Sequence, residues 1–461
     1  MSWENIENNN EKLAIESAPK EIKGRASCIR WRIGALLCTV ALVNFFQRVS
    51  ISVAGDSMMR AFQFSQTQMG TVFSAFVLGY TLFQVPGGML ADRFGPRQVL
   101  GWAMVSWSLF TLLTGTIGRI SSLTGIGVLA ALITLRFIFG IFQAPIFPTS
   151  TRAVANWFPA SERGRANGLA LSGISLGSFL MPPVVSWIVL TWNWQSSFYL
   201  ASLFSSLIAV VWFLYVRDYP SEHHAVNSVE LNAIQRGTPS NSDLFVKSPS
   251  IASQLRSGHL WRLIVSYTLQ GYVGYVFIFW FYLYLVQVRR FGQAEGAWLT
   301  TLPWIFASLT TFGGGYLSDQ LIKTRLGIDW GRRSVPMACQ GVAALLLCVG
   351  ARVENGYLAV AILSLCTGVI LGAEGAYWAS ANQISGKHAG FTGGLMNTGG
   401  NLGGVISPTL TPLLAEHFGW VHALDFAGLI AVGAALLWLW ISPSRQIKGQ
   451  LISAPSIQEV T

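Results

Sequence analysis

Charged residues are scarce in this sequence. Only 11% of the 461 residues are Asp, Glu, Lys or Arg, whereas soluble domains carry about a quarter. The hydrophobic residues, 52% of the chain, gather in continuous runs, and the longer runs have the length of helices that cross a bilayer. They lack the alternation over about ten residues that is typical of membrane β-barrel strands. The scarcity of charge therefore excludes the soluble classes and predicts an all-α membrane protein in contact with the lipid bilayer.

Other patterns are absent from the sequence, and their absence argues against further classes of function. The phosphate-binding pattern GxxxxGK[ST] is missing, which argues against pumping driven by ATP. No catalytic arrangement and no cluster of metal ligands is recognisable, so we expect neither an enzyme nor a bound cofactor or metal. The five cysteines do not have the spacing of metal sites, and we interpret them as small, mostly buried side chains. They are Cys28, Cys38, Cys339, Cys348 and Cys366.

Twelve apolar segments each predict a membrane-spanning helix. A polar connection rich in Ser, Pro and Asn separates the first six from the last six. The sequence therefore predicts two six-helix bundles, 33–216 and 262–442, joined by a mobile cytosolic linker at 217–261. We expect cytosolic tails at 1–32 and 443–461, and the first lacks the apolar core of a secretory signal. The predicted spans are 33–55, 68–91, 97–117, 124–148, 165–190, 196–216, 262–287, 296–320, 334–352, 358–382, 390–415 and 421–442.

Basic residues are distributed asymmetrically about the predicted spans. Of the 30 Lys and Arg residues, only Arg60, Arg119, Arg289, Arg290 and Arg352 fall in loops on the outer side. The positive-inside rule then places both termini in the cytosol, with the protein in a bacterial inner membrane or another plasma membrane. The net charge of +10 is thus a signal of topology, and we do not expect a nucleic-acid partner.

The two halves resemble each other in sequence. Gly173 and Pro182 in the fifth span recur, at one common spacing, as Gly399 and Pro408 in the eleventh. Repeated matches at one spacing indicate two parallel halves related by an axis along the membrane normal, with a binding site between them at mid-depth. Halves of this kind can expose the site to one side at a time, which is the architecture of a secondary transporter.

The segment GGMLADRFGPRQ (87–98), at the end of the second span, suggests a gate. Its paired glycines allow helices to approach closely. Asp92 has Arg93 and Arg97 nearby in sequence, and such a cluster could latch the inner gate. The eighth span ends in a similar segment, GGGYLSDQL, with Asp319 at the matching position. We predict a gating role for these four charged residues, against the alternative of ordinary loop electrostatics.

The span count, the central linker and this loop resemble the major facilitator superfamily over nearly the whole chain. Two further segments are similar to its anion:cation symporter family: RFIFGIFQAPIFPTSTRAVANWFPASERGRANGLALSG (136–173) and TGGLMNTGGNLGGVISP (392–408). That family includes bacterial galactonate, glucarate and hexuronate permeases and the vesicular glutamate and sialic acid carriers. The resemblance implies the major facilitator fold and transport of a small organic anion, without specifying the substrate.

Two arginines interrupt apolar spans, Arg48 in the first and Arg136 near the middle of the fourth. A charged arginine at the bilayer centre costs about 2.5–3.5 kcal/mol, so such a residue suggests a functional site. The planar guanidinium suits a carboxylate. We predict that both arginines bind substrate, as the resemblance also implies for these positions. The alternative is arginines capped by backbone carbonyls or extended towards the interface.

Gln47 and Gln143 stand where proton symporters of this family typically carry Asp and Glu. Those carboxylates are the expected proton carriers, and an amide cannot take up a proton, so coupling has moved or is absent. Glu374, inside the tenth span, is the best remaining candidate, because a buried carboxyl can load and unload protons near neutrality. It could instead form a structural ion pair between helices, be a charge at a helix end, or pair with Arg48 or Arg136 across the empty site.

Further polar side chains could complete the pocket. Hydroxyls and amides can both donate and accept hydrogen bonds, which suits the body of a sugar acid. Each could equally be a packing hydrogen bond between helices. At the outer end of the first span, we expect Asp56 to be a solvated cap or a gate charge. The remaining pocket candidates are Gln47, Tyr80, Gln84, Gln143, Gln270, Tyr272, Tyr275, Tyr377 and Asn397, and Glu374 is a candidate for contact with the substrate as well.

These observations predict a monomeric secondary transporter that imports a small organic anion by alternating access, most simply a monocarboxylate sugar acid. A proton gradient is the expected driving force, with sodium coupling, uniport and anion exchange as alternatives. A zwitterionic substrate, whose positive group would meet Glu374, is a second interpretation, and a membrane sensor that does not transport is a third. The sequence names neither the substrate nor the coupling ion.

Overall fold

The structure is a computed structural model that describes residues 25–159, 161–236, 255–385 and 389–444. Within these ranges the regular structure is helical and no strand occurs. Each of the twelve predicted spans corresponds to one helix or to a pair of helices separated by a short break. The prediction of an all-α membrane protein is therefore confirmed.

The first bundle is built from helices whose ends carry clear sequence signals. Helix α3 begins with a capping box between Ser65 and Gln68, and α9 begins where the Asn193 side chain accepts from Ser196 N at 2.9 Å. The fourth span is broken after Gln143, so it forms two helices. The bundle comprises α2 (Ile29–Phe62), α3 (Gln66–Phe94), α4 (Pro96–Gly115), α5 (Ile117–Thr124), α6 (Val128–Gln143), α7 (Ile146–Trp157), α8 (Arg163–Thr191) and α9 (Trp194–Tyr215).

The second bundle repeats this plan. Its fourth span is also broken, here at Ala373, so Glu374 becomes the first residue of a new helix. The bundle comprises α12 (Gly258–Leu283) with a π-helical turn (Tyr284–Val288), α13 (Gln293–Leu299), α14 (Leu302–Ile322), α15 (Gly327–Arg352), α16 (Gly356–Gly372), α17 (Glu374–Ser385), α18 (Ala389–Phe418) and α19 (Trp420–Leu437).

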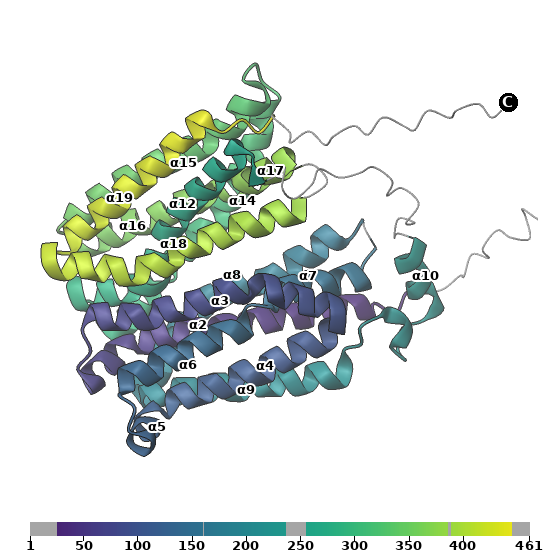
Figure 1. The fold of residues 1–461 in the computed structure, drawn as a ribbon, viewed down its shortest axis with the longest axis horizontal. Helices are drawn as coiled ribbons and strands as arrows, with labels where there is room; N and C mark the ends of the chain where they lie inside the picture. The colour runs from purple at the N-terminus through teal and green to yellow at the C-terminus, as the bar shows by residue number, and fades with distance from the viewer. Residues whose placement is uncertain (1–24, 160, 237–254, 386–388, 445–461) are drawn as a thin grey trace, which may run out of the picture.

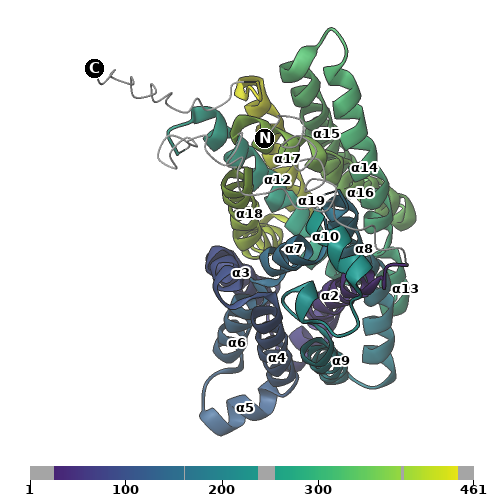
Figure 2. The same cartoon turned by 90° about the vertical axis from the view of Figure 1, so that its right-hand side faces the viewer.

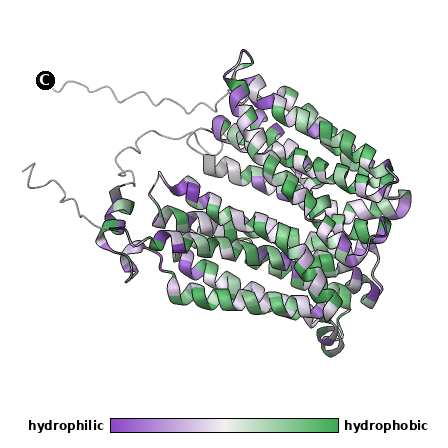
Figure 3. Cartoon of the chain, turned by 180° about the vertical axis from the view of Figure 1, so that it is seen from behind, coloured by the Kyte–Doolittle hydropathy of each residue, from purple (hydrophilic) through white to green (hydrophobic). Residues whose placement is uncertain are grey.

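Nine spans among the described residues are long and apolar enough to cross a membrane, or ten if the bent pair of α4 and α5 counts as one span. Helices α14 and α18 fall outside this set because glycine and hydroxyl residues lower their hydropathy. Apolar residues nevertheless dominate the middle of most helices, whereas polar residues concentrate towards the ends (Figure 3). The distribution fits helices that span a bilayer.

The two bundles lie side by side and touch mainly at one end. Figures 1 and 2 show the first bundle, purple to teal, beside the second, green to yellow. We call the end where α2 begins and α9 ends the terminal end, and the end that carries the α2–α3 turn and α5 the distal end. The ribbons approach each other at the distal end and diverge towards the terminal end (Figure 1).

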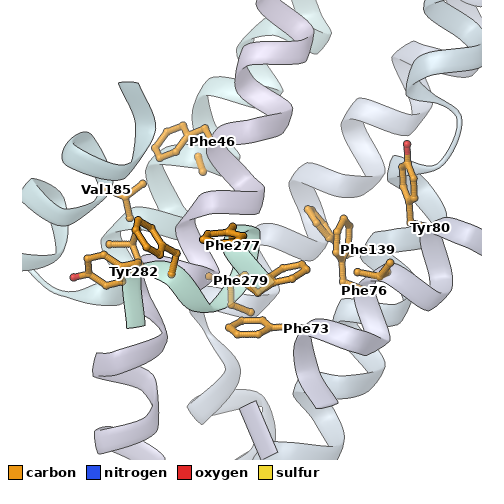
Figure 4. Packing of buried hydrophobic residues seen from close by; sticks show 14 of the residues in the cluster. Phe46, Phe73, Phe76, Tyr80, Phe139, Val185, Phe277, Phe279 and Tyr282 are labelled. Carbon is orange, nitrogen blue, oxygen red and sulfur yellow. The ribbon is translucent and has the colours of Figure 1, made fainter. Parts of the chain in front are cut away.

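Contacts between the bundles at the distal end are close. The Phe73 and Phe279 rings stack with centroids 4.8 Å apart, and Figure 4 shows the two rings facing each other. The Ser74 and Thr409 hydroxyls share a hydrogen bond of 2.8 Å. Gly70 lies so near the second bundle that a Cβ there would be 2.0 Å from the carbonyl oxygen of Pro408. The distal end is therefore sealed by packed side chains and backbone.

A short helix of the connecting segment, α10 (Ser228–Arg236), is fixed to the first bundle at the terminal end. The buried Glu230 carboxylate accepts hydrogen bonds from the backbone nitrogens of Ile29, at 3.0 Å, and Arg30, at 3.1 Å. The Ser27 hydroxyl also donates to it. A carboxylate is favoured there because it satisfies free N–H groups at the positive end of α2. The Ser/Pro/Asn-rich part of the predicted linker lies outside the described residues.

We expect Glu230→Gln to lower the stability of the protein by about 1–3 kcal/mol, the usual effect of disrupting a buried hydrogen-bonded group. Burial raises the pKa of the Glu230 carboxyl, but hydrogen bonds from Ser27, Arg30 and Ile29 and the charge of Arg30 outweigh burial and hold the pKa below its usual value. Because the folded-state pKa is depressed, this stabilisation is complete above the unfolded-state pKa and is lost as pH falls through the folded-state pKa.

Thermal unfolding of the purified protein at pH 7 and pH 3.5 checks this prediction. The Tm of Glu230→Gln should lie below the wild-type Tm at pH 7, and the difference should shrink at pH 3.5. Glu354→Gln, which changes an exposed acid, is the matched control. A Tm deficit of equal size at both pH values would contradict the proposed role of the carboxylate charge.

Candidate functional site

Arg48 and two glutamines form a hydrogen-bonded row inside the first bundle. Arg48 Nε donates to Gln143 Oε1 at 3.1 Å, and Gln143 Nε2 donates to Gln47 Oε1 at 3.4 Å. Gln47 Nε2 in turn donates to the carbonyl of Ala201 on α9, also at 3.4 Å. Both glutamines are fully buried. The row therefore holds the Arg48 side chain on α2 against the end of α6.

Arg136 lies on α6 close to the same place. Its guanidinium carbon is 4.3 Å from the centre of the Phe139 ring and 5.3 Å from the centre of the Phe76 ring. The Arg48 guanidinium carbon is 5.1 Å from the same Phe76 ring and 4.7 Å from the Tyr80 ring. Figure 4 shows Phe76 beside Phe139, with Tyr80 further along α3. Aromatic faces thus surround both cations and stabilise them by cation–π interactions.

The hydrogen-bonding capacity of these arginines is largely unused. All three guanidinium nitrogens of Arg136, and Nη2 of Arg48, are buried without a partner. Arg136 is only 1% exposed. The structure therefore does not support the alternative that backbone carbonyls cap Arg136. Unpaired buried donors on a charged group are costly, and an anion that accepts from both guanidinium groups would remove this cost.

No carboxylate of the first bundle compensates the two central arginines. Between residues 29 and 215 the acids are Asp56, Asp92 and Glu162. Each lies near an end of the bundle, where an arginine pairs with it. The centre of the first bundle is consequently a positive region enclosed by apolar groups, which favours an anionic ligand.

Polar side chains connect this region to the second bundle. Gln84 Nε2 donates to the Tyr80 hydroxyl at 3.4 Å. Gln84 Oε1 accepts from Asn397 Nδ2 at 3.0 Å and from Asn401 Nδ2 at 3.4 Å, both on α18. The Tyr275 hydroxyl, on α12, donates to Asn401 Oδ1 at 2.8 Å. The predicted residues Tyr80, Gln84, Tyr275 and Asn397 therefore lie together at the interface between the bundles.

Glu374, at the start of α17, is surrounded by hydrogen-bond donors. The Tyr267 hydroxyl lies 3.1 and 3.0 Å from its two carboxylate oxygens. Gln270 Nε2 donates to it at 3.2 Å, and Trp378 Nε1 donates at 3.1 Å. Gln340 Nε2 donates to Gln270 Oε1 at 2.7 Å and so orients that amide. No ion pair of Glu374 with Arg48 or Arg136 is present among the side chains that the structure describes.

The Glu374 cluster and the bridging cluster share one face of α12. Tyr267, Gly271 and Tyr275 are spaced four residues apart, so they lie on one side of the helix. The rise of 1.5 Å per residue places Tyr267 and Tyr275 about 12 Å apart along the axis. Glu374 thus lies about two helical turns from the bridging residues, towards the terminal end.

Two predicted pocket residues form their hydrogen bonds within the second bundle. The Tyr272 hydroxyl shares a hydrogen bond of 3.0 Å with Thr411. The Tyr377 hydroxyl shares one of 2.6 Å with Ser266. Both tyrosines are buried inside the second bundle. Their hydroxyls join helices of one bundle, which corresponds to the alternative of packing hydrogen bonds.

The predicted gating charges form local pairs. Asp92 lies 3.7 Å from Arg152 Nε, and Asp319 lies 2.7 Å from Arg332 Nη1. The backbone nitrogen of Arg97 donates to Asp218, and the Arg93 guanidinium covers the Phe94 ring. The expected cluster of Asp92 with its two neighbouring arginines is thus replaced by a pair within the first bundle.

A charge at the distal end joins the two bundles instead. Asp56 is only 3% exposed and pairs with Arg60. It also accepts from Gln287 Nε2 at 2.9 Å and from Gln293 Nε2 at 3.0 Å, both in the second bundle. Thr67 donates to Glu416 across the same interface. Asp56 is therefore buried at the contact between the two bundles and is not a solvated cap.

Four residues that were not predicted from the sequence complete these clusters: Tyr267, Gln340, Trp378 and Asn401. Trp378 and Asn401 each lie four residues after a predicted site residue, on the same helical face, and that spacing is a usable signal. Tyr267 lies one turn before Gln270. Gln340 comes from α15, and only the tertiary structure brings it to the site. In the described residues, no group of three His, Cys, Asp or Glu side chains could hold a metal ion.

Two pseudo-equivalent helical bundles that enclose buried polar residues, and meet mainly at one end, define a membrane transporter of the alternating-access class. The sequence profile of the Major Facilitator Superfamily matches residues 37–328 and 320–451. The chain belongs to that family, whose members transport solutes and are not enzymes. The prediction made from the motifs and span count is thereby confirmed.

Named relatives align over nearly their whole length. A protein named probable galactarate/D-glucarate transporter, from Bacillus subtilis (strain 168), is 33% identical over 436 residues, which cover 92% of this chain and 94% of that protein. The hexuronate transporter of the same organism is 29% identical over 87% of this chain and 92% of its own. A probable sulfoacetate transporter of Cupriavidus necator is 30% identical over 90% and 94%.

Solved structures share the fold. A bacterial homologue of the human lysosomal transporter Spinster, in an inward-facing and unoccupied conformation, superposes with a TM-score of 0.75 at 16% identity and covers 90% of this chain and 97% of its own. The D-xylose–proton symporter gives a TM-score of 0.69 at 15% identity, over 90% and 99%. These comparisons confirm the major facilitator fold.

Proposed function

We propose that this protein carries small organic anions of the sugar-acid type and that Arg48 and Arg136 bind a carboxylate of the substrate. The proposal rests on the pair of central guanidinium groups: all three nitrogens of Arg136 and Nη2 of Arg48 are buried without an acceptor. A carboxylate offers two acceptor oxygens in a geometry that matches a guanidinium. The acids named for the relatives, galactarate, D-glucarate, hexuronate and sulfoacetate, support an anionic substrate.

Hydroxyl groups of the substrate would meet the bridging side chains. Gln84, Asn397, Asn401 and Tyr275 offer amide and hydroxyl groups that can donate as well as accept. They come from both bundles, so a substrate that binds them joins the bundles across the interface. Binding is in this way linked to closure, because the closed state gains contacts that the open state lacks.

We also propose how the protein is oriented in the membrane. The distribution of basic residues supports a cytosolic terminal end, with both termini in the cytosol of a bacterial inner membrane or plasma membrane. The sealed distal end then faces outward, and the carrier, a monomer, is in an inward-facing state.

Proton coupling through Glu374 is the last component of the proposed function. The amides of Gln47 and Gln143 are committed to positioning Arg48 and cannot be protonated. Glu374 lies at the break between α16 and α17 in the second bundle, among uncharged donors. A carboxyl in this position can be neutral or ionised according to the charge of the ligand beside it.

Counterflow in proteoliposomes tests the function without any ion gradient. Vesicles preloaded with unlabelled sugar acid should take up the labelled acid transiently, and protein-free vesicles should not. A thermal-shift screen of organic acids at two pH values selects the substrate to label. If sugar acids neither raise the Tm nor support counterflow, the proposal is wrong.

A zwitterionic substrate is the second candidate, and Glu374 is the observation that favours it, because no cation pairs with this carboxylate among the described side chains. A panel of competing compounds, tested in the same vesicles, distinguishes a zwitterionic from an anionic substrate. Inhibition led by amino acids or amino-sugar acids would support the zwitterion, whereas inhibition led by simple sugar acids supports the anion. Any substrate flux excludes a sensor that does not transport.

A further inference from the structure

The three central charges do not balance in the empty protein. Arg48 and Arg136 carry two positive charges, and Glu374 is the one central acid among the described residues. The empty site therefore keeps one net positive charge when Glu374 is ionised, and two when it is protonated. Closure of the terminal end would enclose this charge in a region of low dielectric, where an unbalanced charge is strongly disfavoured.

We propose that the charge of the substrate sets the number of protons that accompany it: a monoanion crosses alone, whereas a dianion crosses with one proton bound to Glu374. This inference rests on the proposed function of organic anion transport. A monoanion with ionised Glu374 leaves the closed site neutral. A dianion with ionised Glu374 leaves it negative, and protonation of Glu374 restores neutrality.

The surroundings of Glu374 can hold either protonation state. Its partners Gln270 and Trp378 donate hydrogen bonds, and the Tyr267 hydroxyl can rotate to donate or to accept. The titratable groups packed around it are Tyr267 on α12, Tyr377 on α17 and Cys339 on α15. On α14 the charged or titratable groups are Tyr316 and Asp319, in the last two turns of the helix. On α18 they are Glu416 and His417, in its last turn, and α16 has none besides Tyr357 and Cys366.

The net charge and the protons moved in one transport cycle follow from these charges. Inward movement of a monoanion carries one negative charge. Inward movement of a dianion with its proton carries the same net charge and also brings one proton into the cell. The empty protein returns with one net positive charge enclosed, so its return is slow, and exchange of two anions is faster than net transport. A zwitterion brings no net charge and leaves the positive charge in place.

Galactonate, as the monoanion, and galactarate, as the dianion, provide the probes. Both are first tested for counterflow in proteoliposomes. With the membrane potential clamped at zero, an inward proton gradient of one pH unit should then accumulate the dianion about tenfold, the factor for one coupled proton. The same gradient should not accumulate the monoanion.

Glu374→Gln sharpens the test, because the amide stays neutral. With this variant the dianion balances both arginines without a proton, so its uptake should become independent of pH. The monoanion would leave one positive charge, and its counterflow should fall about tenfold or more. Glu354→Gln, an exposed acid in the loop between α15 and α16, should behave like the wild type.

The outcomes separate the two proposals. If neither anion shows counterflow, the proposed function fails. If both show counterflow and respond equally to the proton gradient, the inference on protons is overturned and the proposed function stands. Should Glu374→Gln not fold, calorimetric binding to the wild-type protein in two buffers of different ionisation enthalpy decides. Uptake of one proton with the dianion and none with the monoanion supports the inference, and equal uptake refutes it.

Discussion

Arg48→Ala is expected to abolish substrate binding and transport. The guanidinium of Arg48 is held by Gln143 and retains an unpaired buried nitrogen that an anion would fill. Truncating one member of a buried charged pair costs about 2–5 kcal/mol, which corresponds to a loss of affinity of roughly 30-fold or more. Loss of the substrate-induced rise in Tm, together with loss of counterflow, measures the effect.

Two further variants distinguish loss of charge from loss of geometry. Arg48→Lys keeps the positive charge but removes the planar fork, so we expect partial binding at best. Arg119→Ala removes an exposed arginine from α5, far from the central residues, and should bind normally. If Arg48→Ala retained wild-type affinity while folded, the assignment of the anion site would be untenable.

Gly70→Ala is expected to prevent closure of the distal end. A Cβ at residue 70 would lie 2.0 Å from the carbonyl oxygen of Pro408 and 3.1 Å from the Cα of Thr409. Both atoms belong to the backbone of α18, so a side-chain movement cannot relieve the overlap. Overpacking of this kind costs about 1–3 kcal/mol. At 2 kcal/mol the sealed state loses about 30-fold in population relative to a state in which the distal end is open.

Accessibility of the distal interface measures this shift. Ser74 lies between the bundles, where its hydroxyl contacts Thr409. A cysteine introduced by Ser74→Cys should react slowly with an impermeant maleimide in the otherwise wild-type protein and at least about tenfold faster when Gly70→Ala is added. Gly313→Ala on α14, where a Cβ meets no atom within 4 Å, is the matched control. Equal labelling rates with normal counterflow would refute the predicted role of Gly70.

Composition and continuous apolar runs were sufficient to predict an all-α membrane fold. Spans of the right length need no tertiary information, because every backbone group in lipid must be satisfied within its own helix. The internal repeat also predicted that the two halves are parallel copies related by an axis along the membrane normal. The predicted ends of the helices were less accurate. α2 begins at Ile29 and ends at Phe62 rather than spanning 33–55, because polar and apolar residues at both ends continue the helix beyond the apolar core.

The site was predictable where a charge interrupts an apolar run. Arg48, Arg136 and Glu374 stand out for that reason. Neutral polar residues carry a weaker signal, since a tyrosine in a span serves equally for packing. Tyr275 and Tyr377 illustrate this: both are tyrosines of the second bundle, yet Tyr275 lies at the interface between the bundles and Tyr377 bonds Ser266 inside its own bundle.

By itself the sequence determined the class of the protein, the number of spans and the presence of two central arginines opposite one acid, because these follow from residue type and spacing along single helices. Only the tertiary structure decided the partners of those charges. It assigned Gln47 and Gln143 to positioning, gave Glu374 three neutral donors and made Asp56 the link across the sealed end. Such pairings depend on contacts between helices far apart in the chain, which local pattern does not specify.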